Sequence, residues 1–194
     1  MRQLRSAAHR LVPALRRACL LLAAAAAGCA AAAAESVRPP IVCEWASTNF
    51  AWGAQVTLRG IAADGRVLMY DSREPIGGGS VPVDDLMLSN LPTAADLTRR
   101  YAGAWPTNIT VAETDLERLA ELASAVAGGD VSREPNANDM GQSSLHCFVP
   151  ADVDGSYAVV TVVSHGDWEE RNEHPDAPAL AALIVQLLGM PNIP

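Results

Sequence analysis

The first 34 residues constrain the fold most, because their composition keeps them out of any packed core. Five arginines lie within the first 17 residues, and an uncharged run of mostly alanine follows over residues 18–34. A basic start followed by an apolar stretch is the layout of an export signal. The 160 residues that remain are enough for one hydrophobic core, so we expect a single globular domain.

A short motif inside the uncharged run indicates how the chain is held after export. The residues Ala26-Ala27-Gly28-Cys29 resemble the lipobox of bacterial lipoproteins, in which a cysteine after small residues is lipidated and becomes the new N-terminus. Ala26 departs from that pattern, in which leucine is commonest. The resemblance implies a signal peptide over residues 1–28, palmitate or similar acyl chains on Cys29, a tether over residues 29–40 and a domain over residues 41–194. Two or more acyl chains anchor a protein stably in a membrane.

Two other interpretations of the N-terminus stay open. A cut within residues 30–34, after an A-x-A-like site, would release a soluble periplasmic or secreted domain. An uncut run would act as a membrane anchor, although its 17 residues fall short of the roughly 20 that a spanning helix needs. Ala30 rather than aspartate follows the cysteine, which by similarity to enterobacterial lipoproteins implies the outer membrane. We therefore expect a lipid-anchored protein of the cell envelope.

The charge of the exported part restricts its partners. The whole chain carries 14 basic and 22 acidic residues, and five of the basic residues but none of the acidic ones lie in the first 34. The remainder thus carries nine basic against 22 acidic residues, a net charge of −13. Binding to nucleic acid requires clustered cations and is not expected. Divalent metals and basic peptides or proteins fit this charge, and solubility alone is the alternative explanation.

Two cysteines, Cys43 and Cys147, lie in the predicted domain. Export places them in an oxidising compartment, where an even pair is typically bridged. A disulfide between them is therefore predicted. The alternative is a nucleophilic cysteine assisted by the neighbouring His146, but adjacent side chains of an extended strand point to opposite faces, so His146 is a poor base for Cys147.

Hydrophobic periodicity predicts a mixture of strands and helices. Residues 54–61 and 66–70 form a hairpin that turns at Asp64-Gly65, and the β-branched run over residues 157–164 is a strand. Thr114 and Glu117 form a capping box at the start of a helix. A last helix begins at Asp176.

Residues 130–144 lack periodicity and are expected to be a loop. Because the strands are few and do not alternate strictly with helices, we predict an α+β domain. Its expected form is a small, mainly antiparallel sheet with helices packed on one face.

Two groups of residues are candidates for a binding site. Trp45, Phe50 and Trp52 fall within eight residues; exposed, they would stack on sugars or anchor a protein partner, and buried, they would belong to the core. His165 and Asp167 follow the predicted strand, with His174 close behind. They could form a metal site, or they could belong to a solvated loop.

The sequence favours binding over catalysis. It contains no H-E-x-x-H, C-x-x-C or G-x-S-x-G motif, and these are the spacings that typically place metal ligands or a nucleophile. No catalytic residue, metal ligand or cofactor is predicted. We expect an envelope-anchored, non-catalytic binding or inhibitor-like lipoprotein, possible partners being cationic. The alternative is a metal-assisted envelope hydrolase that uses the region of His165 and Asp167.

Overall fold

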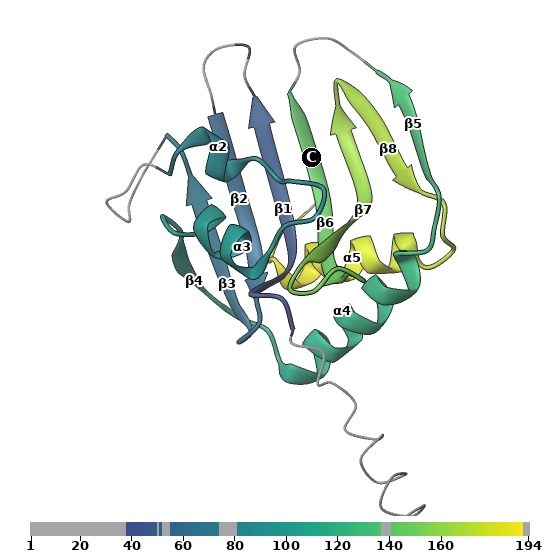
Figure 1. Cartoon of the computed structure of the whole chain (residues 1–194), viewed down its shortest axis with the longest axis horizontal. Helices are drawn as coiled ribbons and strands as arrows, with labels where there is room; N and C mark the ends of the chain where they lie inside the picture. Colours follow the sequence, from purple (N-terminus) through teal and green to yellow (C-terminus); the bar gives the residue numbers. More distant parts are fainter. Residues whose placement is uncertain (1–37, 50, 52–54, 74–80, 137–140, 192–194) are drawn as a thin grey trace, which may run out of the picture. The chain divides into compact units, whose positions relative to one another are not determined.

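One antiparallel sheet of eight strands dominates the part of the chain described by the computed structural model, which covers residues 38–49, 51, 55–73, 81–136 and 141–191 (Figure 1). The spatial order of the strands is β4-β3-β2-β1-β6-β7-β8-β5. Their bounds are β1 Ile41–Asn49, β2 Gln55–Ala62, β3 Arg66–Asp71, β4 Trp105–Thr110, β5 Val131–Pro135, β6 Gln142–Pro150, β7 Tyr157–Gly166 and β8 Trp168–Asn172. Four helices accompany them within the same residues, α2 Val83–Leu86, α3 Ala94–Arg100, α4 Glu113–Val126 and α5 Ala177–Leu187.

Two meanders meet at the centre of the sheet. Strands β1, β2 and β3 follow one another along the chain and across the sheet, and β6, β7 and β8 do the same on the other side. The meanders are joined where β1 pairs with β6, with Cys43 opposite Cys147. The hairpin predicted at Asp64-Gly65 is confirmed as β2 and β3, and Gly65 supplies the positive φ of 82° that the turn requires.

Local sequence signals predicted the start of the last helix correctly, at Asp176, and the start of α4 incorrectly. Thr93 caps α3, because its side chain accepts from the backbone of Asp96 while the Asp96 carboxylate accepts from the backbone of Thr93. The capping box predicted at Thr114 is wrong. Helix α4 begins at Glu113, and its N-cap is Ala112, two residues before Thr114; the side chain of Ala112 makes no hydrogen bond.

Two hydrophobic cores lie on the sheet, because successive strand residues point to opposite sides. Leu145 and Cys147 of β6 belong to the first core, which includes buried residues of α4 and α5. Phe148 of the same strand belongs to the second core, with Leu86 of α2 and Leu97 of α3. Figure 1 shows the two helix pairs in separate places on the sheet.

The predicted α+β class is therefore confirmed only in its coarse form, a mainly antiparallel sheet accompanied by helices. The helices do not all pack on one face, and the sheet is larger than expected. Residues 130–144, expected to be a loop, contain β5 and the start of β6. Within the residues that the structure describes, no helix has the length and apolar character needed to cross a membrane.

Candidate functional site

A disulfide fixes the centre of the sheet. Cys43 and Cys147 are bonded, with an S–S distance of 2.01 Å and a sequence separation of 104 residues. Both are fully buried in the first core. The predicted disulfide is confirmed, so neither sulfur is a free nucleophile in this state. His146 faces away from Cys147, as expected for neighbours on a strand, and lies near Glu44 in the adjacent strand.

Glu44 is the centre of a buried charged cluster under α3. Its carboxylate accepts two hydrogen bonds from Arg100, at 3.0 and 2.9 Å, and a third of 2.9 Å from the hydroxyl of Tyr101. The Nδ1 atom of His146 lies 3.6 Å from Glu44 Oε1, beyond hydrogen-bond distance. The side chains of Glu44 and Arg100 are 0% and 4% exposed. The cluster therefore ties the central strand β1 to α3.

The environment of Glu44 keeps it ionised. Burial raises the pKa of its carboxyl, but the charge of Arg100 and the hydrogen bonds to the carboxylate outweigh burial and lower the pKa from 4.5 to about 2. Burial, followed by the negative charge of Glu44, raises the pKa of Tyr101 well above its ordinary value. No sequence motif had indicated this cluster. An available signal was an acidic residue within the apolar stretch Ile41-Val42-Cys43-Glu44-Trp45.

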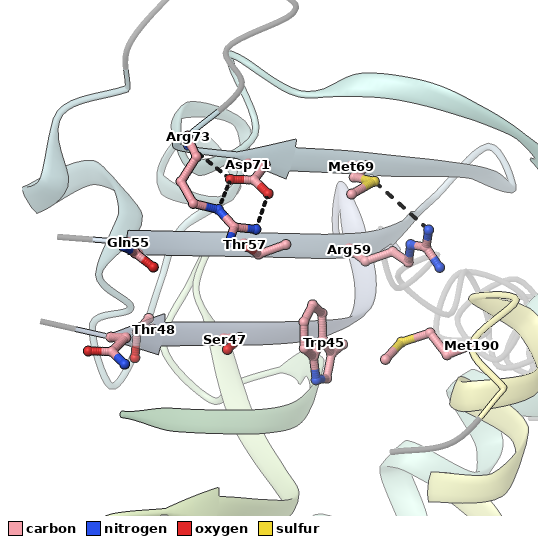
Figure 2. Close-up of a pocket in the computed structure, with 11 residues that line it drawn as sticks. Trp45, Ser47, Thr48, Gln55, Thr57, Arg59, Met69, Asp71, Arg73 and Met190 are labelled. Atoms are coloured by element: carbon pink, nitrogen blue, oxygen red, sulfur yellow. Dashed lines mark hydrogen bonds and ion pairs between the residues drawn. The ribbon is translucent and has the colours of Figure 1, made fainter. Parts of the chain in front are cut away.

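A cleft of about 440 Å³ opens on the first three strands beside the end of α5 (Figure 2). We call it the Trp45 cleft. Its lining residues are Trp45, Ser47, Thr48, Asn49, Gln55, Thr57, Arg59, Met69, Asp71, Arg73 and Met190. Figure 2 shows hydroxyl and amide side chains along β1 and β2, between Trp45 and Met190 at one end and the Asp71–Arg73 ion pair at the other.

Two arginines of the Trp45 cleft are held by neighbouring groups. Arg59 donates to the backbone oxygen of Leu188 at 3.0 Å, beyond the last turn of α5. Arg73 pairs with both carboxylate oxygens of Asp71, at 3.0 and 2.7 Å. Trp45, a predicted site residue, is partly buried here. Its partners in that prediction, Phe50 and Trp52, lie outside the described residues.

A second cavity, of about 520 Å³, lies over β6, β7 and β8 and reaches β5. We call it the Trp168 pocket. Its lining residues are Thr48, Ala51, Arg133, Gly141, Gln142, Ser144, Ser164, Asp167, Trp168 and Glu170. Ser144 pairs with Ala46 across β1 and β6, and Ala46 belongs to the second core. The Trp168 pocket therefore opens on the opposite side of the sheet from the Trp45 cleft.

Hydrogen bonds fix the floor of the Trp168 pocket. The side-chain amide of Gln142 donates to the backbone oxygen of Trp168 at 2.8 Å and accepts from its backbone nitrogen at 3.2 Å. The same amide donates to Ser164, whose hydroxyl also bonds that of Ser144. The two hydrogen bonds from the Gln142 amide therefore hold the backbone of Trp168 at the pocket.

A cation already occupies the aromatic face of Trp168. The guanidinium carbon of Arg133 lies 4.1 Å from the centre of the Trp168 ring, which is within the range of cation–π attraction. The Nε atom of Arg133 is also 3.2 Å from Glu170 Oε1. Trp168 remains 40% exposed. The ring and the carboxylate together form a receptor for a guanidinium group, and the chain itself supplies that group.

All three residues of the second candidate site lie in the part of the chain that the structure describes. Asp167 lines the Trp168 pocket. His165 is not among the lining residues, and its Nδ1 lies 3.8 Å from Glu169 Oε1. His174 is 3.8 Å from the carboxylate of Asp176, before α5. In the described ranges, no three or more His, Cys, Asp or Glu side chains are grouped so that they could hold a metal ion.

Asp167 thus joins Arg133, Trp168 and Glu170, which the sequence analysis did not select. The sequence carried a partial signal for them, the cluster Asp167-Trp168-Glu169-Glu170. Their assembly with Arg133 depends on the pairing of β5 with β8, which the sequence did not indicate.

Comparisons with family models, with curated proteins and with solved structures found no match to this chain.

Proposed function

We propose that this chain is a non-catalytic binding protein of the cell envelope, anchored by lipid at Cys29, and that it binds a cationic partner at the Trp168 pocket. The observation that carries the proposal is the stacking of Arg133 on Trp168 beside Glu170. A site that holds a guanidinium of its own chain has the geometry and charge to hold a basic side chain of another.

The charge of β5, β8 and the segments that flank them supports a cationic partner. Residues 130–136 and 165–176 contain seven carboxylates and two arginines, a net charge of −5. The seven are Asp130, Glu134, Asp167, Glu169, Glu170, Glu173 and Asp176. An excess of like charges along two neighbouring strands attracts an oppositely charged partner and speeds its association. The Trp45 cleft is less suited to a cation, because Arg59 and Arg73 line it and Asp71, the carboxylate among its described lining residues, is paired with Arg73.

The alternative of a metal-assisted hydrolase has less support. It requires His165 and Asp167 to act on one substrate, yet His165 contacts Glu169 while Asp167 lines the pocket. A thermal shift with zinc, calcium and chelator tests it directly. A rise in Tm with either metal that is reversed by the chelator would favour the hydrolase.

A pair of peptides tests the proposed binding. Hexa-arginine amide and its hexa-citrulline counterpart have nearly the same shape, but only the first is charged. They would be titrated by calorimetry into the full chain, purified in detergent from bacterial membranes with its disulfide intact. We expect binding of the arginine peptide alone, weakening at least tenfold in Kd between 50 and 500 mM salt, because salt screens exposed charges.

Charge-neutral variants locate the site. We expect Glu170→Gln and Asp167→Asn each to weaken binding of the arginine peptide by about three- to tenfold, the range for partly exposed ion pairs. Glu121→Gln is the matched control, because Glu121 is an exposed carboxylate on α4 and outside the pocket. Equal losses in all three variants would indicate diffuse attraction to a net charge and contradict a site at Trp168.

A further inference from the structure

The outer edge of β5 is an unpaired strand edge beside the Trp168 pocket. β5 is the last strand of the sheet and pairs only with β8 in the part of the chain that the structure describes. All five of its residues are exposed, and Val131 is 45% exposed. Figure 1 shows β5 at the rim of the sheet next to β8. Edge strands of this kind can pair with an added chain unless the edge is protected.

Hydrogen bonds at both ends of β5 establish which backbone groups face outward. The backbone nitrogen of Asn136 donates to the oxygen of Asp167 at 3.0 Å, and the nitrogen of Glu173 donates to the oxygen of Asp130 at 2.9 Å. In an antiparallel pair, hydrogen-bonded and non-hydrogen-bonded positions alternate. Residues 130, 132, 134 and 136 therefore direct their backbone groups to β8. The odd-numbered residues direct theirs away from the sheet.

The outward groups can support a short ladder. Val131 and Arg133 each present an N–H and a carbonyl, and Pro135 presents a carbonyl but has no N–H to offer. These five groups are the complement of a short extended segment. The opposite edge of the sheet is less suitable, because β4 contains Pro106 and its pairing with β3 has a register irregularity. Both features interrupt an added strand.

The side chains flanking this edge specify the occupant. Ser132 and Glu134 lie on one side of β5, with Glu169 opposite Glu134 in β8. Val131 and Arg133 lie on the other side. An added strand would therefore match the edge with basic residues toward Glu134 and apolar residues toward Val131. A second copy of this chain is a poor occupant, because it would bring the same excess of carboxylates to the edge.

We propose that β5 binds an extended segment of a partner with alternating basic and apolar residues, which adds to the sheet as a further strand. The proposal rests on the proposed function, because both require a cationic partner. The basic side chains of the added strand would lie on the side of Glu134 and Glu169, and its apolar side chains on the side of Arg133 and the Trp168 pocket. Main-chain hydrogen bonds to the edge would supply affinity, and the alternating side chains would supply specificity.

The test compares two forms of one peptide, acetyl-Thr-Arg-Val-Arg-Val-Arg-Thr-amide. The second form carries N-methyl groups on both valines, so it keeps the charge but cannot donate hydrogen bonds from those positions. Both are titrated into the full chain in detergent, and hydrogen–deuterium exchange is read at single residues. We expect the methylated peptide to bind at least tenfold more weakly. We also expect the unmethylated peptide to slow exchange at the amides of Val131 and Arg133, and not at Ser132 and Glu134, which already pair with β8.

The outcomes separate this inference from the proposed function. Tight binding of both peptides, with no change in exchange at Val131 and Arg133, would overturn strand addition and leave the cationic site intact. If neither form of the peptide binds and hexa-arginine does not bind either, both strand addition and the proposed cationic site would be overturned. Protection of Val131 and Arg133 without peptide, together with a concentration-dependent rise in mass, would show that a second copy occupies the edge. A Val131→Pro variant, compared with Val131→Thr, removes one outward N–H and should weaken only the unmethylated peptide.

Discussion

Arg100 and Glu44 form a two-pronged ion pair inside the protein, with Nε 3.0 Å from Oε2 and Nη2 2.9 Å from Oε1. Both side chains are excluded from solvent. The pair connects β1, which also carries the disulfide, to α3 in the second core. Taking two charges out of water is costly, and the attraction between them offsets that cost only while both partners are present. Loss of one partner should therefore destabilise the protein, because the other charge would stay buried without its counterion.

Removing one partner should destabilise the fold strongly. We expect Arg100→Met to lower the free energy of unfolding by about 3–5 kcal/mol, because it leaves the Glu44 carboxylate buried without its cation. The neighbouring Arg99→Met is the control, since Arg99 is 58% exposed and pairs with Asp85 and Asp96 on the surface. Its loss should be below about 1 kcal/mol. Urea unfolding measures both values, and similar losses would show that the buried pair has no special role.

The same pair predicts how stability depends on pH. Because the pKa of Glu44 is lowered from 4.5 to about 2 on folding, its contribution is complete above pH 4.5. That contribution is lost as the pH falls from 4.5 toward 2. The loss should be about 3 kcal/mol at full protonation. Unfolding free energies at pH 6 and pH 2.5 would be compared for the wild type and Glu44→Gln. The variant should be less stable at pH 6 and should lose less on acidification, whereas equal losses would exclude Glu44 as the titrating group.

Local sequence signals were sufficient for the hairpin of β2 and β3 and for the presence of both longer helices, but not for the start of α4. The Asp64-Gly65 turn joins two alternating segments, so its hairpin needs no distant contact to be recognised. The disulfide followed from the compartment and an even count of cysteines. That the two cysteines lie opposite each other on neighbouring strands could not be predicted, because the pairing of β1 with β6 joins residues about 100 apart along the chain.

Strands β5 and β8 could not be predicted, since their sequences, Val131–Pro135 and Trp168–Asn172, are rich in charges and polar groups. They are ordered by pairing with each other and with β7 rather than by a buried face of their own. Tertiary pairing overrides weak local preference in such edge strands. The Trp168 pocket is built from these two strands together with β6 and β7. Asp167 could therefore be predicted as a candidate from the sequence, but the position of Arg133 beside Trp168 could not.

The disulfide should supply a large share of the stability. We expect the double variant Cys43→Ala/Cys147→Ala to lose about 2–5 kcal/mol of unfolding free energy. Cross-linking residues 104 apart restricts the unfolded chain strongly, and about 4.7 kcal/mol is the entropic estimate for a loop of about 100 residues. Reductant should destabilise the wild type by a similar amount and leave the double variant unchanged. If reductant leaves the unfolding free energy of the wild type unchanged, even when it is added to the unfolded protein, the disulfide would be contradicted.

Gly166 should tolerate no side chain, although Gly155 should. Gly166 has a φ of 147°, and an added Cβ would lie 1.9 Å from the backbone oxygen of Gly141. Gly155 has a φ of 72°, but a Cβ there would meet no atom within 4 Å. We expect Gly155→Ala to cost about 1 kcal/mol, from backbone strain alone. Gly166→Ala should cost more and should also weaken binding of the arginine peptide, because both Gly141 and the neighbouring Asp167 line the Trp168 pocket. Calorimetric Tm values and peptide titrations of the two variants measure this difference.

The lipid anchor is testable by mass. Processing at the motif Ala26-Ala27-Gly28-Cys29 should give a membrane-bound protein whose mass begins at Cys29 and includes the acyl chains. Intact mass spectrometry of the membrane fraction measures this, and reduction should add two hydrogens for the Cys43–Cys147 bond. Cys29→Ser is the control, since it removes the acylated sulfur and should abolish the acyl mass. A mass that begins within residues 30–35 without acyl chains would show that the domain is released instead, and the proposed cationic partner would then be sought among soluble proteins.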